Sequence, residues 1–416
     1  MNAGILIIGA GIQGASIALE LAHRGRAVTL IERDTLPMNR ASLRNEGKIH
    51  LGLIYAADLT FRTADLQLKG ALSFFPLMKR WLGDRKIGLS TPFQYFVARD
   101  SLMTPDKLGA HYEKLSRQCS ALLHDFPSLG YEGLASHQLA EKIDTPANIN
   151  PDLVEAVFDT CEIAVNTDEL AAAYRDAIDA HPLIDFHSGI ICNGLERSAT
   201  GMRAQCEGYD GAELTIDAEQ IVNCTWEDRM RLDATLGIEP TPGWLHRLKY
   251  RTIAKLPEQM LGTPSVTIVL GAYGDIVIRN DGLAYLSWYP SGCQGWTHDI
   301  APPGEWNLPC RGKPDPEMAL KIHTEALAML SDWRFDLAEA EPLYVDAGAI
   351  VAYGKSDVDD PKSRLHDRTR IGVFGGGDYF SVDPGKLTTG PLFAMAAADQ
   401  ITGDCADEQM SALLTT

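Results

Sequence analysis

Three glycines close to the N-terminus are the residues whose type and spacing most clearly indicate chemistry. Gly9, Gly11 and Gly14 form a G-x-G-x-x-G pattern between an apolar run and a stretch with helical periodicity, and Glu32 closes the next apolar run. In this context the first glycine makes a tight turn, the second lets the backbone approach a pyrophosphate, and the third lets helix and strand pack closely. A carboxylate at position 32 can bind ribose hydroxyls and would repel a 2′-phosphate, which disfavours NADP. The pattern predicts a dinucleotide site and leaves FAD and NAD both open.

Four titratable side chains are candidates for the reaction itself. His50 is the best candidate for a general base, because imidazole titrates near neutral pH, and a dinucleotide that oxidised a hydroxyl group would need a proton acceptor beside it. Lys48 could contact the cofactor or an anionic substrate, and Arg251 and Arg279, on expected strands, could hold a carboxylate by bidentate hydrogen bonds. Each has a structural alternative, since a histidine can bond to cofactor or backbone and charged side chains on a sheet usually face water. An amine substrate needs no strong base, so alcohol and amine oxidation both stay open.

The elements that must position these residues follow an α/β order interrupted by an insertion. Residues 4–34 alternate strand, helix and strand, with contiguous apolar runs that indicate a parallel sheet covered on both faces. Residues 60–145 are helical and polar in pattern and are interpreted as an inserted region, and the α/β order resumes with a helix at 168–180. Between 245 and 290, consecutive apolar segments separated by turn residues predict an antiparallel sheet, a suitable floor for a substrate domain.

The composition of the 416 residues is that of an ordinary globular chain, with 45% hydrophobic and 22% charged residues. The net charge of −19, with no basic segment, argues against nucleic acid or an anionic lipid surface as a partner. Eight cysteines occur without a CxxC pair or metal-ligand spacing, which indicates reduced thiols and no bound metal. The apolar stretch at residues 5–8 is too short for a signal sequence or a membrane span, so we expect no transmembrane segment and a cytoplasmic location.

A second, more specific pattern follows the dinucleotide segment. Asn45, Gly47, Ile49 and His50 occur in the order Asn-x-Gly-x-Ile-His-x-Gly, followed by Tyr55. Together with the glycine turn, this segment resembles the FAD-dependent oxidoreductases of the D-amino-acid oxidase superfamily. That superfamily includes glycine oxidase, sarcosine oxidase, FAD-linked glycerol-3-phosphate dehydrogenase and L-2-hydroxyglutarate dehydrogenase. The local pattern is most similar to the hydroxy-acid members.

Three later segments agree with the family in order, each with one departure. One has Glu169 where the family's Asp-Pro-x-x-Leu has proline. Residues 221–226 are similar to a Val-Val-Asn-Ala-x-Gly strand end that lines the cofactor, with Trp226 in place of glycine. Residues 385–389 resemble the Gly-Gly-Lys-x-Thr-Thr segment of glycerol-3-phosphate dehydrogenases, with Pro384 in place of the first glycine. The likeness therefore covers the expected cofactor domain and leaves the substrate open.

The resemblance implies an α/β, two-domain flavoprotein. Its Rossmann-like FAD-binding domain would be discontinuous in sequence, and its substrate domain would be an antiparallel sheet. The chain then divides into FAD-binding parts at 1–75, 146–235 and 341–416, an inserted substrate-domain part at 76–145, and the substrate sheet at 236–340.

The same resemblance implies cofactor contacts from the glycine turn, the second segment and the last helix. Lys386 would direct a cation at the flavin N1/O2 edge, where negative charge collects when N5 accepts hydride. Asp378, after a run of glycines, could bond the ribityl chain or only cap a turn. The expected FAD contacts are Gly9, Gly11, Ile12, Gln13, Gly14, Glu32, Arg33, Ser42, Arg44, Asn45, Gly47, Lys48, Ile49, Ile191, Cys224, Thr225, Gly376, Gly377, Asp378, Lys386, Leu387 and Thr388.

The expected activity is that of an FAD-dependent dehydrogenase or oxidase, which removes a hydride from a CH–OH or CH–NH group of a small, possibly carboxylated metabolite. Oxygen, a quinone or a protein could accept the electrons. Two alternatives remain, a non-catalytic flavin-binding subunit that scaffolds a partner and an NAD-dependent dehydrogenase. The colour of the protein separates them, since an NAD enzyme is colourless and an inert flavoprotein is not bleached by substrates.

Overall fold

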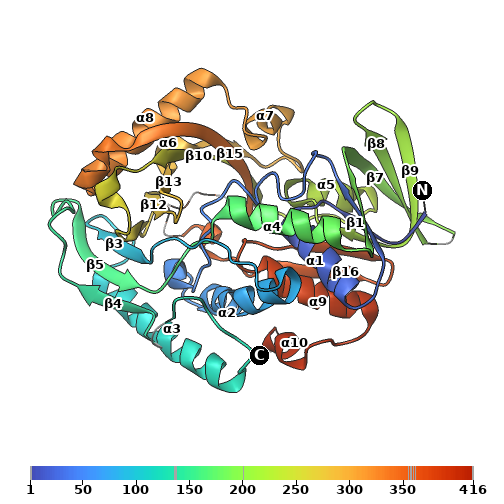
Figure 1. The fold of residues 1–416 in the computed structure, drawn as a ribbon, viewed down its shortest axis with the longest axis horizontal. Coiled ribbons are helices and arrows are strands. Elements are labelled where there is room, and N and C mark those ends of the chain that lie inside the picture. The colour runs from blue at the N-terminus through green and yellow to red at the C-terminus, as the bar shows by residue number, and fades with distance from the viewer. Residues whose placement is uncertain are drawn as a thin grey trace.

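The computed structural model describes residues 2–134, 138–199, 201–354, 356, 358, 360 and 362–414. Two β-sheets form its framework, and helices pack around them (Figure 1). The expected α/β class is confirmed, with one sheet built on the N-terminal strands and a second, mostly antiparallel sheet.

The first sheet forms around the N-terminal apolar runs. β1 (Asn2–Ile8) pairs in parallel with β2 (Val28–Glu32) on one side and with β9 (Glu213–Asn223) on the other. β1 and β2 are buried over most of their length, which is why their sequences are nearly continuous apolar runs. The order across the sheet is β16 (Gly372–Gly376), β17 (Tyr379–Asp383), β9, β1, β2 and β6 (Ile184–Ser188), and β8 (Gly201–Gly208) and β7 (Ile190–Ser198) extend it from β9 by antiparallel pairing.

Helices from both ends of the chain pack together on this sheet. α1 (Ile12–His23) begins at the glycine turn and packs on α9 (Gly390–Thr402), and α2 (Arg62–Leu82) contacts both of them. α4 (Thr167–Ala180) contacts α1 as well. The segments that precede α1 and α9, which carry the two parts of the expected cofactor site, are therefore neighbours in space (Figure 1).

The second sheet is built from strands of three separate stretches of the chain. Its order is β14 (Cys293–Thr297), β10 (Trp244–Lys255), β13 (Leu283–Trp288), β12 (Gly274–Ile278), β11 (Ser265–Val269), β3 (Phe93–Ala98), β5 (Val154–Thr160) and β4 (Ala140–Ile143), and β15 (Glu341–Tyr353) pairs with β10 along its length. The pairing is antiparallel except between β11 and β3. The apolar segments between 245 and 290 are strands β10 to β13, as the sequence predicts.

Some strands lie in a different sheet from the one that the sequence boundaries suggest. β15 pairs in the second sheet, although it opens the stretch 341–416 assigned to the FAD-binding domain, and β5 does so from within 146–235. The helical insertion contributes strands β3 and β4 as well as α2 and α3 (Pro105–Asp125). Pairing partners distant in sequence decide which sheet a strand joins, and local patterns do not report them.

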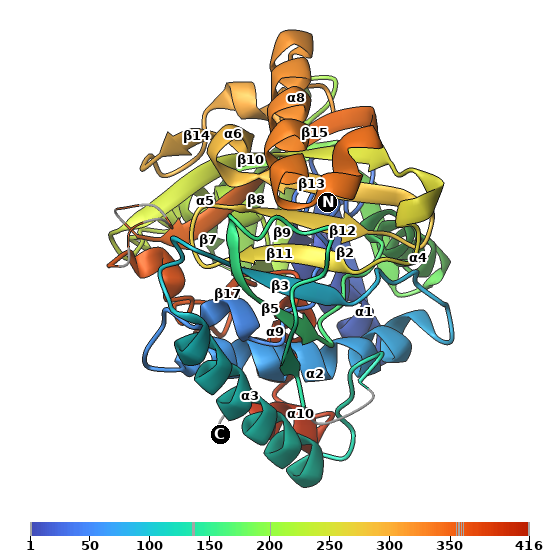
Figure 2. The same cartoon turned by 90° about the vertical axis from the view of Figure 1, so that its left-hand side faces the viewer.

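α8 (Pro316–Trp333) packs on β10, β13 and β15, and α2 and α3 lie on the other side of the second sheet (Figure 2). Among the described helices, none combines the length and apolarity that crossing a bilayer requires. The remaining helices are short: α5 (Arg229–Thr235), α6 (Tyr289–Gly292), α7 (Asn307–Cys310), α10 (Glu408–Leu413), and 3-10 turns at Leu53–Tyr55, Trp226–Asp228, Glu258–Met260, Gly304–Trp306, Phe335–Glu339 and Arg364–His366.

Candidate active site

One cavity extends from the glycine turn of the first sheet to strands β10 and β13 of the second. It encloses about 1480 Å³ of unfilled space, counting its open mouth. Its wall includes residues of the glycine turn, of the segment that follows β2, of the ends of β7 and β9, and of the segment before α9. The cavity therefore brings together the elements that the sequence marks for a dinucleotide and those that it marks for a substrate.

The glycine turn forms one end of the cavity. Gly9 has a φ of +94°, and a Cβ there would lie 2.8 Å from the carbonyl oxygen of Cys224. A Cβ on Gly14 would lie 1.9 Å from the carbonyl oxygen of Gly9, so only glycine lets α1 pack this closely. A Cβ on Gly11 would have a single near neighbour, Ser42 Oγ at 3.1 Å. Gly9 and Gly11 thus line the cavity, whereas Gly14 lies behind it and sets the position of the helix.

The start of α1 has the properties of an anion site. Its N-cap residue, Gly11, has no side chain with which to cap the helix, and Ile12 N–H donates to Ser42 Oγ at 2.8 Å. Glu32 accepts a hydrogen bond from Ala10 N–H at 2.7 Å, and burial raises the pKa of this carboxyl group. A helix N-terminus carries partial positive charge and free N–H groups. The end of the cavity at α1 therefore fits a pyrophosphate, with a carboxylate nearby for a ribose.

Asn45 gives the second segment its shape. Its side-chain amide donates to the carbonyl oxygens of Ala41 at 2.8 Å and Ser42 at 3.0 Å, and its Oδ1 accepts from Gly47 N–H at 2.7 Å. Gly47 has a φ of +72°, and a Cβ there would lie 2.1 Å from the carbonyl oxygen of Val165. Asn45 and Gly47 therefore fold the segment into a tight loop whose other residues form the cavity wall.

A buried ion cluster lies on the wall between the two ends. Arg251 on β10 donates to Asp346 on β15 from Nε at 2.6 Å and from Nη2 at 3.2 Å, and Arg44 Nε lies 3.3 Å from the same carboxylate. Among the described residues, Arg44 Nε and Nη1 are buried without a well-formed hydrogen bond. Two guanidinium groups share one carboxylate, so the cluster has net positive charge and unused donors. These orphaned donors fit an anionic group of a bound dinucleotide.

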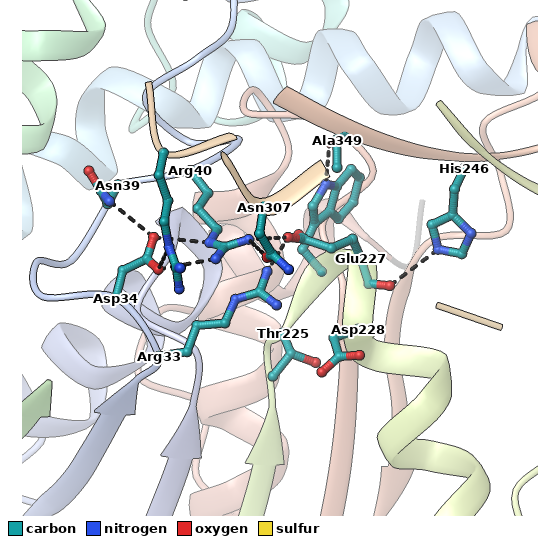
Figure 3. Close-up of polar contacts among 12 residues, drawn as sticks. Arg33, Asp34, Asn39, Arg40, Thr225, Glu227, Asp228, His246, Asn307 and Ala349 are labelled. Carbon is teal, nitrogen blue, oxygen red and sulfur yellow. Dashed lines mark hydrogen bonds and ion pairs between the residues drawn. The ribbon is translucent and has the colours of Figure 1, made fainter. Parts of the chain in front are cut away.

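A second ion network closes the side of the cavity near Glu32. The Arg40 guanidinium binds Asp34 at 3.0 and 3.1 Å, lies 3.5 Å from Glu227, and donates to Asn307 Oδ1 at 2.8 Å (Figure 3). Arg33 pairs with Glu227 across the cavity edge (Figure 3). Although burial opposes ionisation, Arg40 lowers the pKa of Asp34 to about 2. The network ties the ends of β2 and β9 to α7 and therefore fixes the width of the cavity there.

Trp226 occupies the position where the family has glycine. Its φ is +54°, in the left-handed region where glycine is favoured. The indole N–H donates to the carbonyl oxygen of Ala349 on β15 at 2.8 Å. Trp226 therefore adopts a backbone conformation that usually requires glycine and adds a hydrogen bond between the loop after β9 and the second sheet.

Lys48 lies at the end of the cavity near the second sheet, where it is already paired. Its Nζ donates to Asp275 Oδ1 at 2.8 Å and to the hydroxyl of Thr267, and it lies 4.3 Å from the centre of the Phe93 ring. Only 1% of the side chain is exposed. Lys48 therefore joins the second segment to β11 and β12, and its charge is largely neutralised.

His50 is buried at the same end with both ring nitrogens unengaged. Its Nε2 lies 3.5 Å from Glu46 Oε1 and its Nδ1 lies 3.9 Å from Glu162 Oε1, which are long for hydrogen bonds. Within the described residues neither nitrogen makes a well-formed hydrogen bond, and Glu46 is the weak partner of Nε2. Burial and the nearby Lys386 ammonium lower the pKa of His50 below its ordinary value. The imidazole is therefore neutral at pH 7 and can accept a proton.

Lys386 and Glu46 form a loose pair beside His50, with Nζ 3.8 Å from Oε1. Burial lowers the pKa of Lys386 to about 8. Burial would raise the pKa of Glu46, but Lys386 and His50 hold it well below its usual value. Glu46 is therefore ionised, and Lys386 loses its charge only in mildly alkaline solution.

Lys249 is a cation at this end without a carboxylate in contact. It points from β10 into the cavity wall beside Tyr285 of β13, and no carboxylate of the described residues lies within ion-pair distance of its Nζ. Burial alone would lower the pKa of Lys249, but Tyr285, Glu46 and Asp275 raise it above its ordinary value. Lys249 therefore carries a full positive charge that a bound anion could neutralise.

The structure brings most of the sequence-expected cofactor residues together. Those on the cavity wall are Gly9, Gly11, Ile12, Gln13, Glu32, Arg33, Ser42, Arg44, Asn45, Lys48, Ile191, Cys224, Thr225, Lys386 and Leu387. Gly14, Gly47, Ile49 and Thr388 lie directly behind the wall, where Thr388 Oγ1 accepts a hydrogen bond from His50 N–H at 3.0 Å. These four support the wall.

Four other expected site residues lie away from the cavity. Gly376 ends β16, and Gly377 and Asp378 form the exposed turn to β17, where Asp378 pairs with Arg197. Arg279 lies at the end of β12, where Asp168 at 2.8 Å and Asp281 at 2.7 Å neutralise it. Of the four candidates for catalysis, His50, Lys48 and Arg251 line the cavity.

Sequence reasoning did not single out Glu46, Lys249, Arg40, Glu227 or Asp346. Two of these residues could have been identified as site candidates from the sequence. Lys249 is two positions before Arg251 and so shares its face of a strand, and Glu46 is the variable residue inside the Asn-x-Gly pattern. Glu227 and Asp346 act through partners distant in sequence, and Arg40 joins its near neighbour Asp34 to the distant Glu227 and Asn307, which no local pattern reports.

The chain belongs to the FAD dependent oxidoreductase family, whose model matches residues 4–369. No curated protein matches the chain in sequence. Among solved structures, glycine oxidase from Geobacillus kaustophilus is similar with a TM-score of 0.68 and 16% identity, over 97% of this chain and 95% of that one. Iminodiacetate oxidase from Chelativorans sp. BNC1 has a TM-score of 0.64 and 18% identity, over 96% and 95%. L-α-glycerophosphate oxidase from Mycoplasma pneumoniae, with FAD bound, has a TM-score of 0.61 and 14% identity, over 97% and 95%.

The family match confirms three expectations from the sequence. The chain is a member of the D-amino-acid oxidase superfamily, it is an oxidoreductase, and its cofactor is FAD. The alternatives of an NAD-dependent dehydrogenase and of a non-catalytic subunit are thereby set aside. At these levels of identity, the solved structures establish the fold and leave the substrate to be argued from the cavity itself.

Proposed function

We propose that this enzyme oxidises a CH–OH group of a small anionic metabolite at the end of the cavity formed by His50, Lys249 and Lys386. The observation that supports the proposal is a single cavity that joins the glycine turn to this cluster of cations and to an unengaged, neutral imidazole. FAD would lie between the two ends, on the wall residues given above. When bound, its flavin supplies the acceptor for the hydride.

Lys249 is the residue that we assign to the substrate's anionic group. A charge-assisted hydrogen bond in a closed site contributes about 1.5–3 kcal/mol. Lys249 offers this bond because its charge is not neutralised by a direct carboxylate partner, whereas Lys48 is engaged by Asp275 and Arg251 by Asp346. Arg251 also lines the cavity, but we assign it a structural role in the wall. The substrate's anionic group is assigned to Lys249.

His50 is the residue that we assign to the substrate's proton. A hydroxyl group must lose its proton as the hydride leaves, and the neutral imidazole can take it. The carboxylates of Glu46 and Glu162, at 3.5 and 3.9 Å from the ring nitrogens, would then stabilise the imidazolium. This arrangement favours an alcohol substrate.

An amine substrate is the second candidate, supported by Glu46. This ionised carboxylate lines the cavity 3.8 Å from Lys386 and could accept a hydrogen bond from a neutral amine. A neutral amine needs no base to give up hydride, so His50 would then have no chemical role. Replacing His50 by Gln separates the two candidates, because it should slow flavin reduction by alcohols by about 10²–10⁴-fold and by amines only slightly.

The test measures reduction of the enzyme's flavin in the absence of oxygen. Loss of the flavin's visible absorbance is the readout. The panel contains 2-hydroxy acids, amino acids, N-methyl amines, polyols and polyol phosphates. We expect bleaching by an anionic member of the panel and a weaker response from the Lys249→Met variant. Lys255→Met is the matched control, because Lys255 lies at the exposed end of the same strand. Bleaching by neutral polyols alone, or an unchanged response of Lys249→Met, would contradict the proposal.

A further inference from the structure

Away from the proposed substrate end, two cysteines face each other across neighbouring strands. Cys192 on β7 and Cys206 on β8 are directly opposite in the antiparallel ladder. Both belong to the hydrophobic cluster that includes Leu195 and Met202, so their side chains lie on the same face of the sheet. Each residue is 5% exposed. The structure records both as free thiols.

The two positions are close enough for a disulfide bond with little movement. Directly opposite residues have Cβ atoms about 4.5–5.5 Å apart. A disulfide needs about 3.5–4.5 Å. The ladder shifts register between Cys192 and Gly194, and such a bulge gives the strand freedom to adjust. The Cys192 thiol donates to the carbonyl oxygen of Gly194 at 3.5 Å, and the two cysteines are close enough for each to shift the pKa of the other.

The contact makes the two thiols chemically unequal. The interaction between the two thiols lowers the pKa of Cys206 and raises the pKa of Cys192. The Arg231 guanidinium, which donates to the carbonyl oxygen of Cys192 at 2.9 Å, lowers the pKa of Cys192 and offsets part of this difference. Cys206 therefore has more thiolate character and Cys192 stays protonated, which is the arrangement of a reactive thiol with a resolving partner.

The pair also borders the cavity. Cys192 lies on its wall together with Ile190 and Ile191, at the side where Glu32 ends β2. Ile191 is one of the expected FAD contacts. A small oxidant can therefore approach the cysteine pair from the Cys192 side, and a bound dinucleotide would cover this approach.

We propose that Cys192 and Cys206 form a reversible disulfide when the protein meets hydrogen peroxide, and that bound FAD slows its formation. In the first step a thiolate attacks the peroxide, an S–O bond forms, the O–O bond breaks, and hydroxide leaves and takes up a proton as water. In the second step the other sulfur attacks the sulfenic acid, the S–S bond forms, the S–O bond breaks, and a second water leaves. Peroxide is reduced by two electrons and the two thiols are oxidised.

The disulfide itself depends on the two strands alone. Protection by FAD rests on the proposed position of the cofactor along this cavity. The assay reads thiols and requires no turnover, so failure to find an oxidisable substrate would leave its result unchanged.

The experiment exposes FAD-saturated and FAD-depleted protein to graded hydrogen peroxide, blocks remaining thiols by alkylation, and maps peptides by mass spectrometry. In depleted protein we expect a cross-link between Cys192 and Cys206, a mass decrease of about 2 Da, and reversal by dithiothreitol. In saturated protein the cross-link should form about tenfold more slowly, because access limits thiol oxidation. The exposed Cys405 serves as an internal measure of peroxide dose.

Two serine variants provide the controls. Cys206→Ser should lose the cross-link, whereas Cys119→Ser, which removes a buried cysteine from α3, should keep it. Peptide mapping of the wild-type protein tests the proposal even if a variant does not fold. Absence of the cross-link at doses that oxidise Cys405 would overturn the proposal, and equal rates with and without FAD would overturn the protection.

Discussion

Replacing Gly14 by alanine tests whether backbone contact holds the glycine turn. A Cβ at Gly14 would lie 1.9 Å from the carbonyl oxygen of Gly9 and 3.3 Å from the side chain of Cys224. Gly109 in α3 is a matched control, because a Cβ there would meet only ring atoms of Phe158 at 3.8 Å. Neither glycine has a positive φ, so the same substitution removes similar chain entropy at both positions.

The two variants should change stability in opposite directions. Helix propensity favours alanine over glycine by about 1 kcal/mol, so Gly109→Ala should raise the free energy of unfolding by roughly 0.5–1 kcal/mol. At Gly14 the contact with Gly9 must lengthen from 1.9 Å to at least 3.0 Å, a backbone shift of 1.1 Å or more. Overpacking of this kind costs about 1–3 kcal/mol or more, which exceeds the gain in propensity.

The same shift should weaken the cofactor site. It moves the first N–H groups of α1 away from the phosphates, and loss of one hydrogen bond to a charged group costs about 1.5–3 kcal/mol. The Kd for FAD should therefore rise about 10–150-fold in Gly14→Ala and stay unchanged in Gly109→Ala. Urea unfolding of the FAD-free proteins and titration with FAD by fluorescence measure both quantities. A Gly14→Ala protein as stable as wild type, with unchanged FAD affinity, would refute the close packing described here.

Two further predictions concern charge. Asp346→Asn should lower the free energy of unfolding by about 3–5 kcal/mol, because it leaves two buried guanidinium groups without a counter-ion. Asp378→Asn, at an exposed ion pair, should change it by less than about 1 kcal/mol, and urea unfolding of both variants makes the comparison. The rate of flavin reduction should fall as pH drops through the lowered pKa of His50, below 6.5, because protonation removes the base. The rate of flavin reduction should also fall above about pH 8, as Lys386 loses its charge. A rate that stayed constant in rapid-mixing measurements from pH 5 to 9 would refute these assignments.

The glycine turn and the Asn45 to His50 segment could be predicted from sequence because their constraints are local. Gly9, Gly14 and Gly47 are fixed by close backbone contacts and left-handed conformations that exclude a side chain, and Asn45 bonds within its own loop. Residue spacing records constraints of this kind directly. The position of the second segment against the glycine turn then follows from the family resemblance.

Which of Lys249 and Arg251 is left without a carboxylate partner could not be predicted, because the neighbouring strand β15 decides it. Both residues lie on β10 and share one face of it. The register with β15 places Asp346 opposite Arg251 and Gly348 opposite Lys249. Arg251 is therefore paired with a carboxylate and Lys249 is not. The deciding carboxylate is about ninety-five residues away in sequence, and a shift of the register by two residues would exchange the roles.

The run of glycines at 375–377 is a sequence pattern that fits two different structures. A flexible backbone after a strand suits a cofactor contact and a tight hairpin equally well. In the structure Gly375 and Gly376 end β16 and Gly377 begins the turn to β17, at the edge of the first sheet, where Asp378 pairs with Arg197. Position in the sheet, and not composition, separates the two uses.

The central claim is that the substrate's anion is bound by Lys249 at the end of the cavity beside His50. Its most direct test is the substrate dependence of flavin reduction in wild type, Lys249→Met and Lys255→Met, measured by rapid mixing without oxygen. Loss of one charge-assisted bond should raise the apparent Kd of the anionic substrate about 10–150-fold in Lys249→Met, with a smaller effect on the limiting rate and none in Lys255→Met. An unchanged Kd in Lys249→Met would contradict the claim.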